Sequence, residues 1–545
     1  MSDIQDSGSN GSDWGKTMGA PGTQAKDTRQ EDTQEGGDLI HGQQLALVFI
    51  AFCVAFFLVA LDQTILSTAL PTIASHFQAV SDLSWIASAY FLPQAGLVLF
   101  FGRLLVIAPP KTVFLVSIFT FEVGSLLCAL APSVITLIVG RAIAGLGGTG
   151  LWVSIMTIIA RVTTMKQRPI FMGLIGAVFA LASVVGPLLG GAFSDHVSWR
   201  WCFYINLPIG AIAIVTVILA LPRLSIVQKS DSTFKAWLGL DWIGAALSFA
   251  MVTMLLIAVQ WGGNEKPWNS PIVIAFLALF AVFLIAFISW ETWYGPEAIL
   301  PVHILMRRNV CGAAITVFFI SICFVTANYY LPLLYQVRGH SATRSGIDIL
   351  PFMVFGVFFS FVAGAVTSTT GYAWPFLVTF PLIAAAAFGL LFTVNSSTRS
   401  ATVIGFQVLL GVGLGSCIQL PIVIAQGEFA DHDQHLVPQA TSLVTFLQLI
   451  GSSAGLAIAG AVFQGQLRSH LEALNLPSAL FEEVLSSVKA IFSISGPEKT
   501  QVIGAYVAAV ERVFLIGIPC GVCATIGALM IERKKVKMEA ASPAA

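Results

Sequence analysis

The sequence contains little charge. Of its 545 residues, 10% are Asp, Glu, Lys or Arg and 56% are hydrophobic, whereas an ordinary soluble domain has about 25% charged residues. The formal net charge is -1, which gives no support to nucleic-acid binding, because that would require clustered Lys and Arg. With a mean hydropathy of +0.85, most of the chain is expected to lie in a membrane.

Cysteines and catalytic motifs are also scarce. Eight Cys are too few for a disulfide framework in a chain of this length. The pair Cys520-x-x-Cys523 has no third ligand nearby, and Asp431-His-Asp-x-His435 lies in a polar loop, so no metal site is expected. A Walker A sequence is absent, so ATP is not expected to supply energy. The sequence predicts neither an enzyme nor a cofactor.

Residues 1–42 are rich in Gly, Ser, Asp and Gln and show no hydrophobic periodicity. Such a segment cannot bury enough apolar surface to fold, so we expect a disordered tail. The first thirty residues contain no apolar core of a signal peptide. The first long apolar segment is therefore expected to direct membrane insertion.

Fourteen apolar segments follow. A bilayer core about 30 Å thick takes roughly 20 residues per helix, and segments of about that length occupy residues 44–66, 85–107, 112–131, 133–159, 169–193, 202–222, 241–261, 271–291, 311–334, 347–368, 373–393, 402–425, 440–464 and 512–532. An even number of spans places both termini on one side of the membrane.

The distribution of Lys and Arg predicts that this side is the cytosol. Fourteen basic residues lie on the tail side, against five in the short loops opposite, and basic residues favour the cytosolic side. The sequon Asn395-Ser-Ser then falls on the outer side as a candidate glycosylation site. The outer loop 465–511 contains SALFEEVLSSVKAIFSI, which has the pattern of a surface helix, solvated or bound to a partner.

Small residues recur every three or four positions along the fifth span, at Gly173, Gly176, Ala180, Ser183, Pro187 and Gly190. Together they form a smooth stripe that lets a neighbouring helix approach closely. Two explanations remain open: the stripe serves tight helix packing alone, or it forms a seam between helices that can close tightly on one side of the membrane.

Among the ionisable residues within the expected spans, three are singled out: Asp62, Glu122 and Arg141. Charge at membrane depth is costly, so each is expected to face a wet cavity or a partner. Asp62 is a candidate proton carrier. Arg141 is expected to keep a carboxylate ionised or to discharge it as a proton moves, and Glu122 is a further candidate for proton coupling. A structural hydrogen bond for Asp62 and a structural anchor for Arg141 are the alternatives.

Polar uncharged and aromatic residues are spread through the second half. We expect a substrate cavity there, lined by Asn328, Tyr329, Gln336, Gln419 and Gln448. Such a cavity would hold large, mostly apolar molecules with a few polar groups. For any single residue, holding helices together is the competing explanation.

Several segments resemble one family. They are LDQTILSTALP with SWIASAYFL, GRAIAGLGG, GPLLGG continuing into SWRWCFYINLPIG, and SGIDILPF at 345–352. These are similar to the signatures of the major facilitator superfamily, in particular its fourteen-span drug:proton antiporter branch and the fungal toxin and multidrug efflux pumps within it. The resemblance runs from about residue 44 to 532 and is strongest across 60–210.

The resemblance implies an all-α membrane protein with a six-helix bundle at 43–222, a linker with two extra helices at 223–310, a second six-helix bundle at 311–532, and a cytosolic tail at 533–545. It also implies alternating access around a site near the membrane midplane. Within it, Gly186, Pro187, Gly190 and Gly191 match the antiporter motif, and Asp62 and Arg141 match residues linked to proton coupling.

One loop departs from the family pattern. The loop between spans two and three usually reads G-x-x-x-D-x-x-G-R-K, but here it is GRLLVIAPPK, with Val106, Pro109 and Pro110 in place of Asp, Gly and Arg. The usual charge clasp cannot form, so how the transporter gates is open.

The sequence thus predicts a proton-coupled exporter of amphipathic organic compounds, such as fungal secondary metabolites, toxins or drugs. We expect a monomer in the plasma membrane, with the vacuolar membrane as the alternative, whose partners are its small-molecule substrate, protons and the lipid bilayer. A siderophore or vacuolar basic amino-acid carrier is the alternative function. A membrane receptor or scaffold that transports nothing is a more distant one.

Overall fold

The structure is a computed structural model that describes residues 42–77, 83–222, 237, 239–262, 266–300, 302–429, 433–474, 476–486, 491, 494 and 497–533. Within these ranges the regular structure is helical, apart from an isolated bridge between Gly262 and Lys266. Fourteen helices or helix runs are long and apolar enough to cross a membrane, which confirms the expected fold class. The tails expected at 1–42 and 533–545 lie, except for Gly42 and Arg533, outside the described residues.

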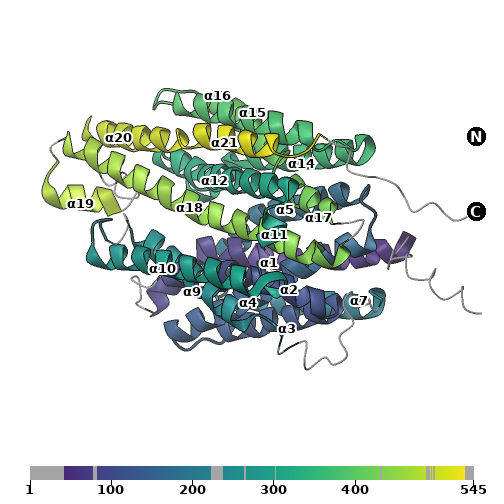
Figure 1. The fold of residues 1–545 in the computed structure, drawn as a ribbon. Helices are drawn as coiled ribbons and strands as arrows, with labels where there is room; N and C mark the ends of the chain where they lie inside the picture. Colours follow the sequence, from purple (N-terminus) through teal and green to yellow (C-terminus); the bar gives the residue numbers. More distant parts are fainter. Residues whose placement is uncertain are drawn as a thin grey trace, which may run out of the picture. The chain divides into compact units, whose positions relative to one another are not determined.

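The first six spans form a group that we call the N-half (Figure 1). Its helices are α1 (Gly42–Phe77), α2 (Leu83–Ile107), α3 (Pro110–Ala129), α4 (Val134–Val162), α5 (Arg168–His196), α6 (Trp201–Tyr204) and α7 (Asn206–Ala220). Local signals fix several boundaries. Ser133 caps α4 by accepting a hydrogen bond from the Thr136 amide, and α3 starts with Pro110 at its first position, where a missing N–H costs nothing.

The last six spans form the C-half, in which α12 packs on α18 and α21, and α15 packs on α16 and α21. Its long helices are α12 (Arg308–Val337), α14 (Leu350–Thr370), α15 (Trp374–Phe392), α16 (Ser400–Gly415), α17 (Leu420–Glu428), α18 (Val437–Glu472), α20 (Pro497–Phe514) and α21 (Gly517–Leu529). Shorter helices are α11 (Val302–Leu305), α13 (Ala342–Asp348), η3 (Gln434–Leu436) and α19 (Ser478–Ser486). The twelfth span is broken between α16 and α17, and the fourteenth between α20 and α21.

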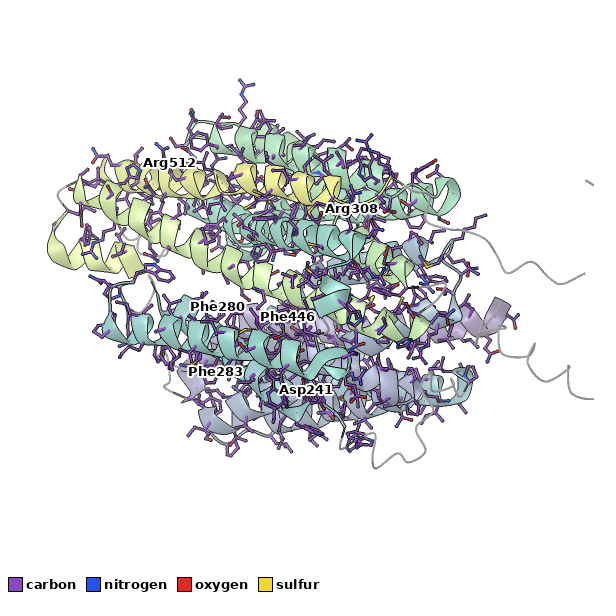
Figure 2. All side chains as sticks on the ribbon, in the orientation of Figure 1. Asp241, Phe280, Phe283, Arg308, Phe446 and Arg512 are labelled. Carbon is purple, nitrogen blue, oxygen red and sulfur yellow. The ribbon has the colours of Figure 1, made fainter. Side chains whose placement is uncertain are left out.

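Two extra helices, α9 (Trp242–Trp261) and α10 (Pro271–Tyr294), pack on each other and are followed by the short turn η2 (Gly295–Glu297). Helix α9 lies against α2 of the N-half, where Ser248 Oγ donates a hydrogen bond to the Gly96 carbonyl at 3.1 Å. Phe280 and Phe283 of α10 share an apolar cluster with Phe446 of α18 (Figure 2). The extra pair therefore contacts both halves.

The segment between the last two spans differs from the expected loop 465–511. Helix α18 continues to Glu472, and α20 already begins at Pro497, so the connection is much shorter. Within it a helix covers Ser478–Ser486, and most of the remaining residues of the surface helix expected over 478–494 lie outside the described residues. Its Val484 carbonyl accepts a hydrogen bond from Tyr506 Oη. Figure 1 shows α18, α19 and α20 meeting at one end of the C-half. Charged residues predicted a loop here, whereas the structure continues α18 and starts α20 through them.

Helix α1 begins and α21 ends at the same end of the bundle, which we call the tail end, and the opposite end is called the far end. Because consecutive spans alternate in direction, α2 ends and α3, α5 and α18 begin at the tail end. The loop with Asn395, between α15 and α16, is at the far end. These two terms fix the positions of the residues described next.

Candidate functional site

A buried ion pair joins α1 and α4 inside the N-half. Asp62 Oδ2 lies 2.5 Å from Nη1 of Arg141, and both side chains are at most 1% exposed. Arg141 also donates from Nε to the Ile86 carbonyl at 3.4 Å, and its guanidinium carbon lies 4.5 Å from the Tyr90 ring centroid. A charge this deep needs such partners. The structure thus places two residues singled out from sequence in direct contact. Their part in proton coupling stays a prediction.

Asn206 extends this pair toward α3. It is the first residue of α7, directly after the break at Ile205 that separates α6 from α7. Its Nδ2 lies 3.5 Å from Asp62 Oδ1 and 3.1 Å from Ser125 Oγ, and the side chain is buried. Sequence reasoning missed this residue. The available signal was a lone amide two residues before Pro208 in an apolar run.

Glu122 lies one turn before Ser125 on α3 and faces α7. A Cβ added at Gly210 would overlap Glu122 Oε1, so glycine provides the room that this carboxyl group occupies. Glu122 is buried, and neither of its carboxyl oxygens has a hydrogen-bond partner among the described residues. Glu122 is therefore not bonded to Arg141. It lies one turn before Ser125 on α3, and its neighbour Gly210 lies about one turn after Asn206 on α7.

The residues of the antiporter motif differ in what they contact. A Cβ at Gly186 would overlap Thr64 Oγ1 of α1, and that hydroxyl donates a hydrogen bond to the Ala182 carbonyl at 3.0 Å. Pro187 lies inside α5 and Gly190 is buried, but a Cβ at Gly191 would meet open space. Close packing of α1 on α5 thus depends on Gly186. It faces Thr64, which lies two residues after Asp62 on α1.

The small stripe of α5 continues as a contact between the halves near the tail end. A Cβ at Gly173 would lie 3.0 Å from the backbone Cα of Phe361 on α14, and one at Gly364 of α14 would overlap the Pro169 carbonyl. On the opposite side of the protein, a Cβ at Gly102 of α2 would overlap Ser442 Oγ of α18. Both seams between the halves are therefore in backbone-close contact near the tail end.

Between these seams and the far end lies a cavity of about 320 Å³. Residues from α1, α2, α4 and α5 of the N-half and from α12, α14, α16 and α18 of the C-half line it. Four of the predicted cavity residues are in this lining: Asn328, Tyr329, Gln419 and Gln448. The structure adds Gln63, Gln94 and Trp152. The sequence reasoning missed these because it searched for amides in the second half only.

Gln336 lies elsewhere, so its placement in the cavity was wrong. It is in the last turn of α12, where its Nε2 donates to Ser345 Oγ at 3.2 Å beyond the cavity lining. Asp62 is also absent from the lining, although its neighbour Gln63 is part of it. The carboxylate thus meets a partner, Arg141, and not the cavity. At the far end, the exposed Asn395 accepts hydrogen bonds from Ser397 and Thr398 in its own loop.

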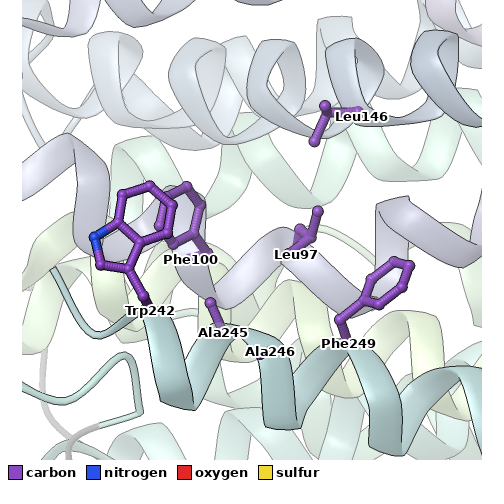
Figure 3. Close-up of a pocket in the computed structure, with 7 residues that line it drawn as sticks. All are labelled: Leu97, Phe100, Leu146, Trp242, Ala245, Ala246 and Phe249. Atoms are coloured by element: carbon purple, nitrogen blue, oxygen red, sulfur yellow. The ribbon is translucent and has the colours of Figure 1, made fainter.

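A second cavity, of about 460 Å³, lies between α2, α4 and α9 (Figure 3). Leu97, Phe100 and Leu146 line one side, and Trp242 and Phe249 line the other, with Ala245 and Ala246 between them. These side chains are apolar or aromatic, and their one hydrogen-bonding group, the Trp242 indole N–H, donates to the Trp237 carbonyl. The central cavity is the better candidate for a substrate site.

The atypical loop 102–111 is compact in the structure. Pro109 and Pro110 form the N-cap and first residue of α3, and Val106 is buried in α2. Arg103 is buried as well, within electrostatic reach of Glu297 and Asp241 from the extra helix pair. From the C-half, Gln439 Nε2 of α18 donates to the Ala298 carbonyl, directly after η2, at 3.1 Å. The charge partners expected within the loop thus come from the segment that flanks α9 and α10.

Comparison with known proteins decides the family. The sequence matches the Major Facilitator Superfamily over residues 52–456. The chain belongs to the Major Facilitator Superfamily. It is 38% identical over 513 residues to efflux pump aunC of Aspergillus niger, covering 93% of this chain and 89% of that protein. It is 37% identical over 498 residues to the rubrofusarin-specific efflux pump aurT of Gibberella zeae, covering 91% of each.

Solved structures of this superfamily have the same fold. The human organic anion transporter MFSD10 aligns with a TM-score of 0.60 at 14% sequence identity, covering 90% of this chain and all of the other. At this identity the likeness concerns the fold alone. Membership in the superfamily makes the protein a multi-pass membrane protein of a transporter family, as expected from the sequence.

Proposed function

We propose that the protein is a secondary active transporter that exports amphipathic organic compounds, such as fungal secondary metabolites, in exchange for protons. The observation that carries this proposal is the cavity between the two halves, which helix contacts close at the tail end. A site between two helix bundles is what alternating access requires. Relatives named as efflux pumps support export as the direction.

The ion pair between Asp62 and Arg141 is the proposed coupling element. When Asp62 takes up a proton, Arg141 loses its counter-ion inside the N-half, and breaking a buried pair in this way costs about 3–5 kcal/mol if nothing moves. A shift of α1 against α4 relieves that cost. Because Gln63 is the next residue on α1 and lines the cavity, the same shift changes the substrate site.

Glu122 is the proposed second proton site. It lies one turn from Ser125 on α3, Asn206 contacts both Ser125 and Asp62, and the two oxygens of Glu122 have no partner among the described residues. A carboxyl group placed there can hold a proton or pass one to Asp62 through the amide and hydroxyl between them. The substrate and the proton then bind at different side chains, so the coupling acts through helix movement.

We place both termini in the cytosol and the protein in the plasma membrane as a monomer, with the vacuolar membrane as the alternative. Basic residues flanking the spans at the tail end support this orientation. The closed tail end then faces the cytosol. In this orientation the structure corresponds to the state from which substrate leaves and a proton enters.

The siderophore or vacuolar basic amino-acid carrier has less support. A cationic substrate needs carboxylates in its site, and none of the described residues that line the cavity is Asp or Glu. The receptor or scaffold has less support again, because it gives no role to the cavity or to the ion pair beside it.

The test is efflux from proteoliposomes loaded with the neutral dye Nile red, with an imposed proton gradient. Asp62→Asn is expected to abolish gradient-driven efflux and to retain exchange of labelled for unlabelled dye without a gradient. Equal amounts of monodisperse protein in the vesicles provide the control. Undiminished gradient-driven efflux by Asp62→Asn would refute the assigned coupling role.

A further inference from the structure

The central cavity contains no group that could neutralise an ionic substrate. None of the described residues that line it carries a carboxylate, ammonium, guanidinium or imidazole group. Asp62, which precedes the lining residue Gln63, is paired with Arg141, and both are buried within the N-half. A charged ligand would lose its hydration on entering this cavity and would gain no opposite charge in return.

In place of charges, five side-chain amides reach the cavity from both halves. Gln63 and Gln94 belong to the N-half, and Asn328, Gln419 and Gln448 belong to the C-half. An amide both donates and accepts hydrogen bonds, so it can pair with a carbonyl, a hydroxyl or an ether without any charge. The amides thus offer polar contacts on two opposing sides of a bound molecule.

Gln419 has the most informative environment of the five. It lies at the break between α16 and α17, as the residue that precedes α17. Its Oε1 is shielded from solvent and has no hydrogen-bond partner among the described residues. A buried acceptor without a partner is costly, so this atom is suited to a hydroxyl or N–H group supplied by a ligand.

Aromatic rings form a continuous row along the same cavity and join the two halves. Phe56 lies 4.9 Å from Trp152 and 6.4 Å from Phe179, measured between ring centroids. Phe179 then lies 6.4 Å from Phe324 of the C-half, and Phe324 lies 6.0 Å from Phe352. All five rings line the cavity. Their faces and edges favour a flat, ring-containing ligand.

From these observations we infer that the cavity takes uncharged, flat aromatic compounds bearing hydroxyl or carbonyl groups, and that it discriminates against organic cations and anions. This inference rests on the proposed function for its role in transport, but the binding step stands on the cavity alone. The amides select for hydrogen-bonding oxygen atoms, the ring row selects for flatness, and the lack of ionic partners excludes charge.

Three probes built on one ring system test the inference. They are 1,8-dihydroxyanthraquinone, which is neutral, anthraquinone-2-sulfonate, an anion, and an anthraquinone bearing a trimethylammonium group, a cation. Equilibrium binding is measured on the purified full chain in nanodiscs, without any proton gradient. We expect the neutral probe to bind about tenfold or more tightly than either ion, because a site built for hydrogen bonds rejects ligands that leave it unpaired.

Asn328→Asp is the decisive variant, because it adds one carboxylate to the cavity at almost constant shape. The affinity for the cationic probe should rise about tenfold, and that for the neutral probe should fall. Asn395→Asp makes the same chemical change in the exposed far-end loop and should alter neither affinity. Gln419→Leu should weaken binding of the dihydroxy probe about two- to tenfold and leave unsubstituted anthraquinone unaffected.

The inference is overturned if the wild-type protein binds the cation or the anion as tightly as the neutral probe. It is also overturned if none of the probes binds although thermal unfolding shows that the protein is folded. The same holds if Asn328→Asp and Asn395→Asp change the probe affinities equally. The outcome is separate from that of the proposed function. Selective binding without gradient-driven efflux would refute the proton antiport and leave the substrate class standing, whereas gradient-driven efflux of all three probes would do the reverse.

Discussion

The two halves share one helix plan but bury different kinds of polar group. In the N-half, Asp62, Arg141 and Glu122 place charged or chargeable groups deep among the helices. In the C-half, the buried polar groups among the described residues are amides and hydroxyls, such as Gln407, whose Nε2 donates to Tyr335 Oη at 2.6 Å. In the proposed mechanism, protons act on the N-half, and the C-half supplies neutral hydrogen bonds.

The largest effect is expected from breaking the ion pair on one side only. Arg141→Met leaves Asp62 buried without a counter-ion, so the variant should lose about 3–5 kcal/mol of stability together with gradient-driven efflux. Adding Asp62→Asn should recover most of the stability and none of the coupling. Thermal unfolding and proteoliposome efflux measure the two quantities. Equal stability of the single and double variants would contradict a buried pair.

The second effect concerns the room that Gly210 leaves for Glu122. Gly210→Ala places a methyl group on Glu122 Oε1, so the carboxyl group or α7 must shift, at a cost of about 1–3 kcal/mol. The proton-driven efflux rate should fall because α7 also carries Asn206.

Combining Gly210→Ala with Glu122→Ala serves as the control, because the smaller side chain removes the overlap. This double variant should regain the stability of Glu122→Ala alone, as measured by thermal unfolding. If Gly210→Ala destabilises the protein equally in both backgrounds, the overlap is not the cause.

The smallest effect is expected in the C-half. Gln407→Leu removes the hydrogen bond to Tyr335 and should cost about 1 kcal/mol of stability. The number of protons exchanged per substrate should stay unchanged, because no chargeable group is involved. Measuring proton and dye fluxes together tests this, and a changed ratio would show that the C-half takes part in coupling after all.

Hydropathy predicted the spans well because membrane helices need long apolar runs, and the fourteen spans agree in number with the structure. Asp62, Arg141 and Glu122 stood out as isolated ionisable residues in such runs, since a charge at that depth is costly without a partner or a wet cavity. The contacts between them could not be predicted, because they depend on how α1, α3, α4 and α7 pack. Gln336 was misplaced for a related reason, because its position in sequence did not reveal that the last turn of α12 extends beyond the cavity.

The misjudged start of the last span has a different cause. Glu498, Lys499, Glu511 and Arg512 make this stretch read as a polar loop, yet α20 forms there, packs on α18 and α12, and belongs with α21 to the fourteenth candidate span. Composition locates the membrane boundary and does not locate the end of the helix.

The extra helix pair has a mechanical consequence. It is fastened to α2 by the bond from Ser248 to the Gly96 carbonyl and to α18 by the bond from Gln439 to the Ala298 carbonyl. A rocking motion that parts α2 from α18 cannot keep both fastenings at their present lengths. In the proposed alternating-access cycle, one of these two hydrogen bonds must therefore break or the helix pair must bend, and because α9 packs more extensively on α2 than on α18, the pair is expected to move with the N-half.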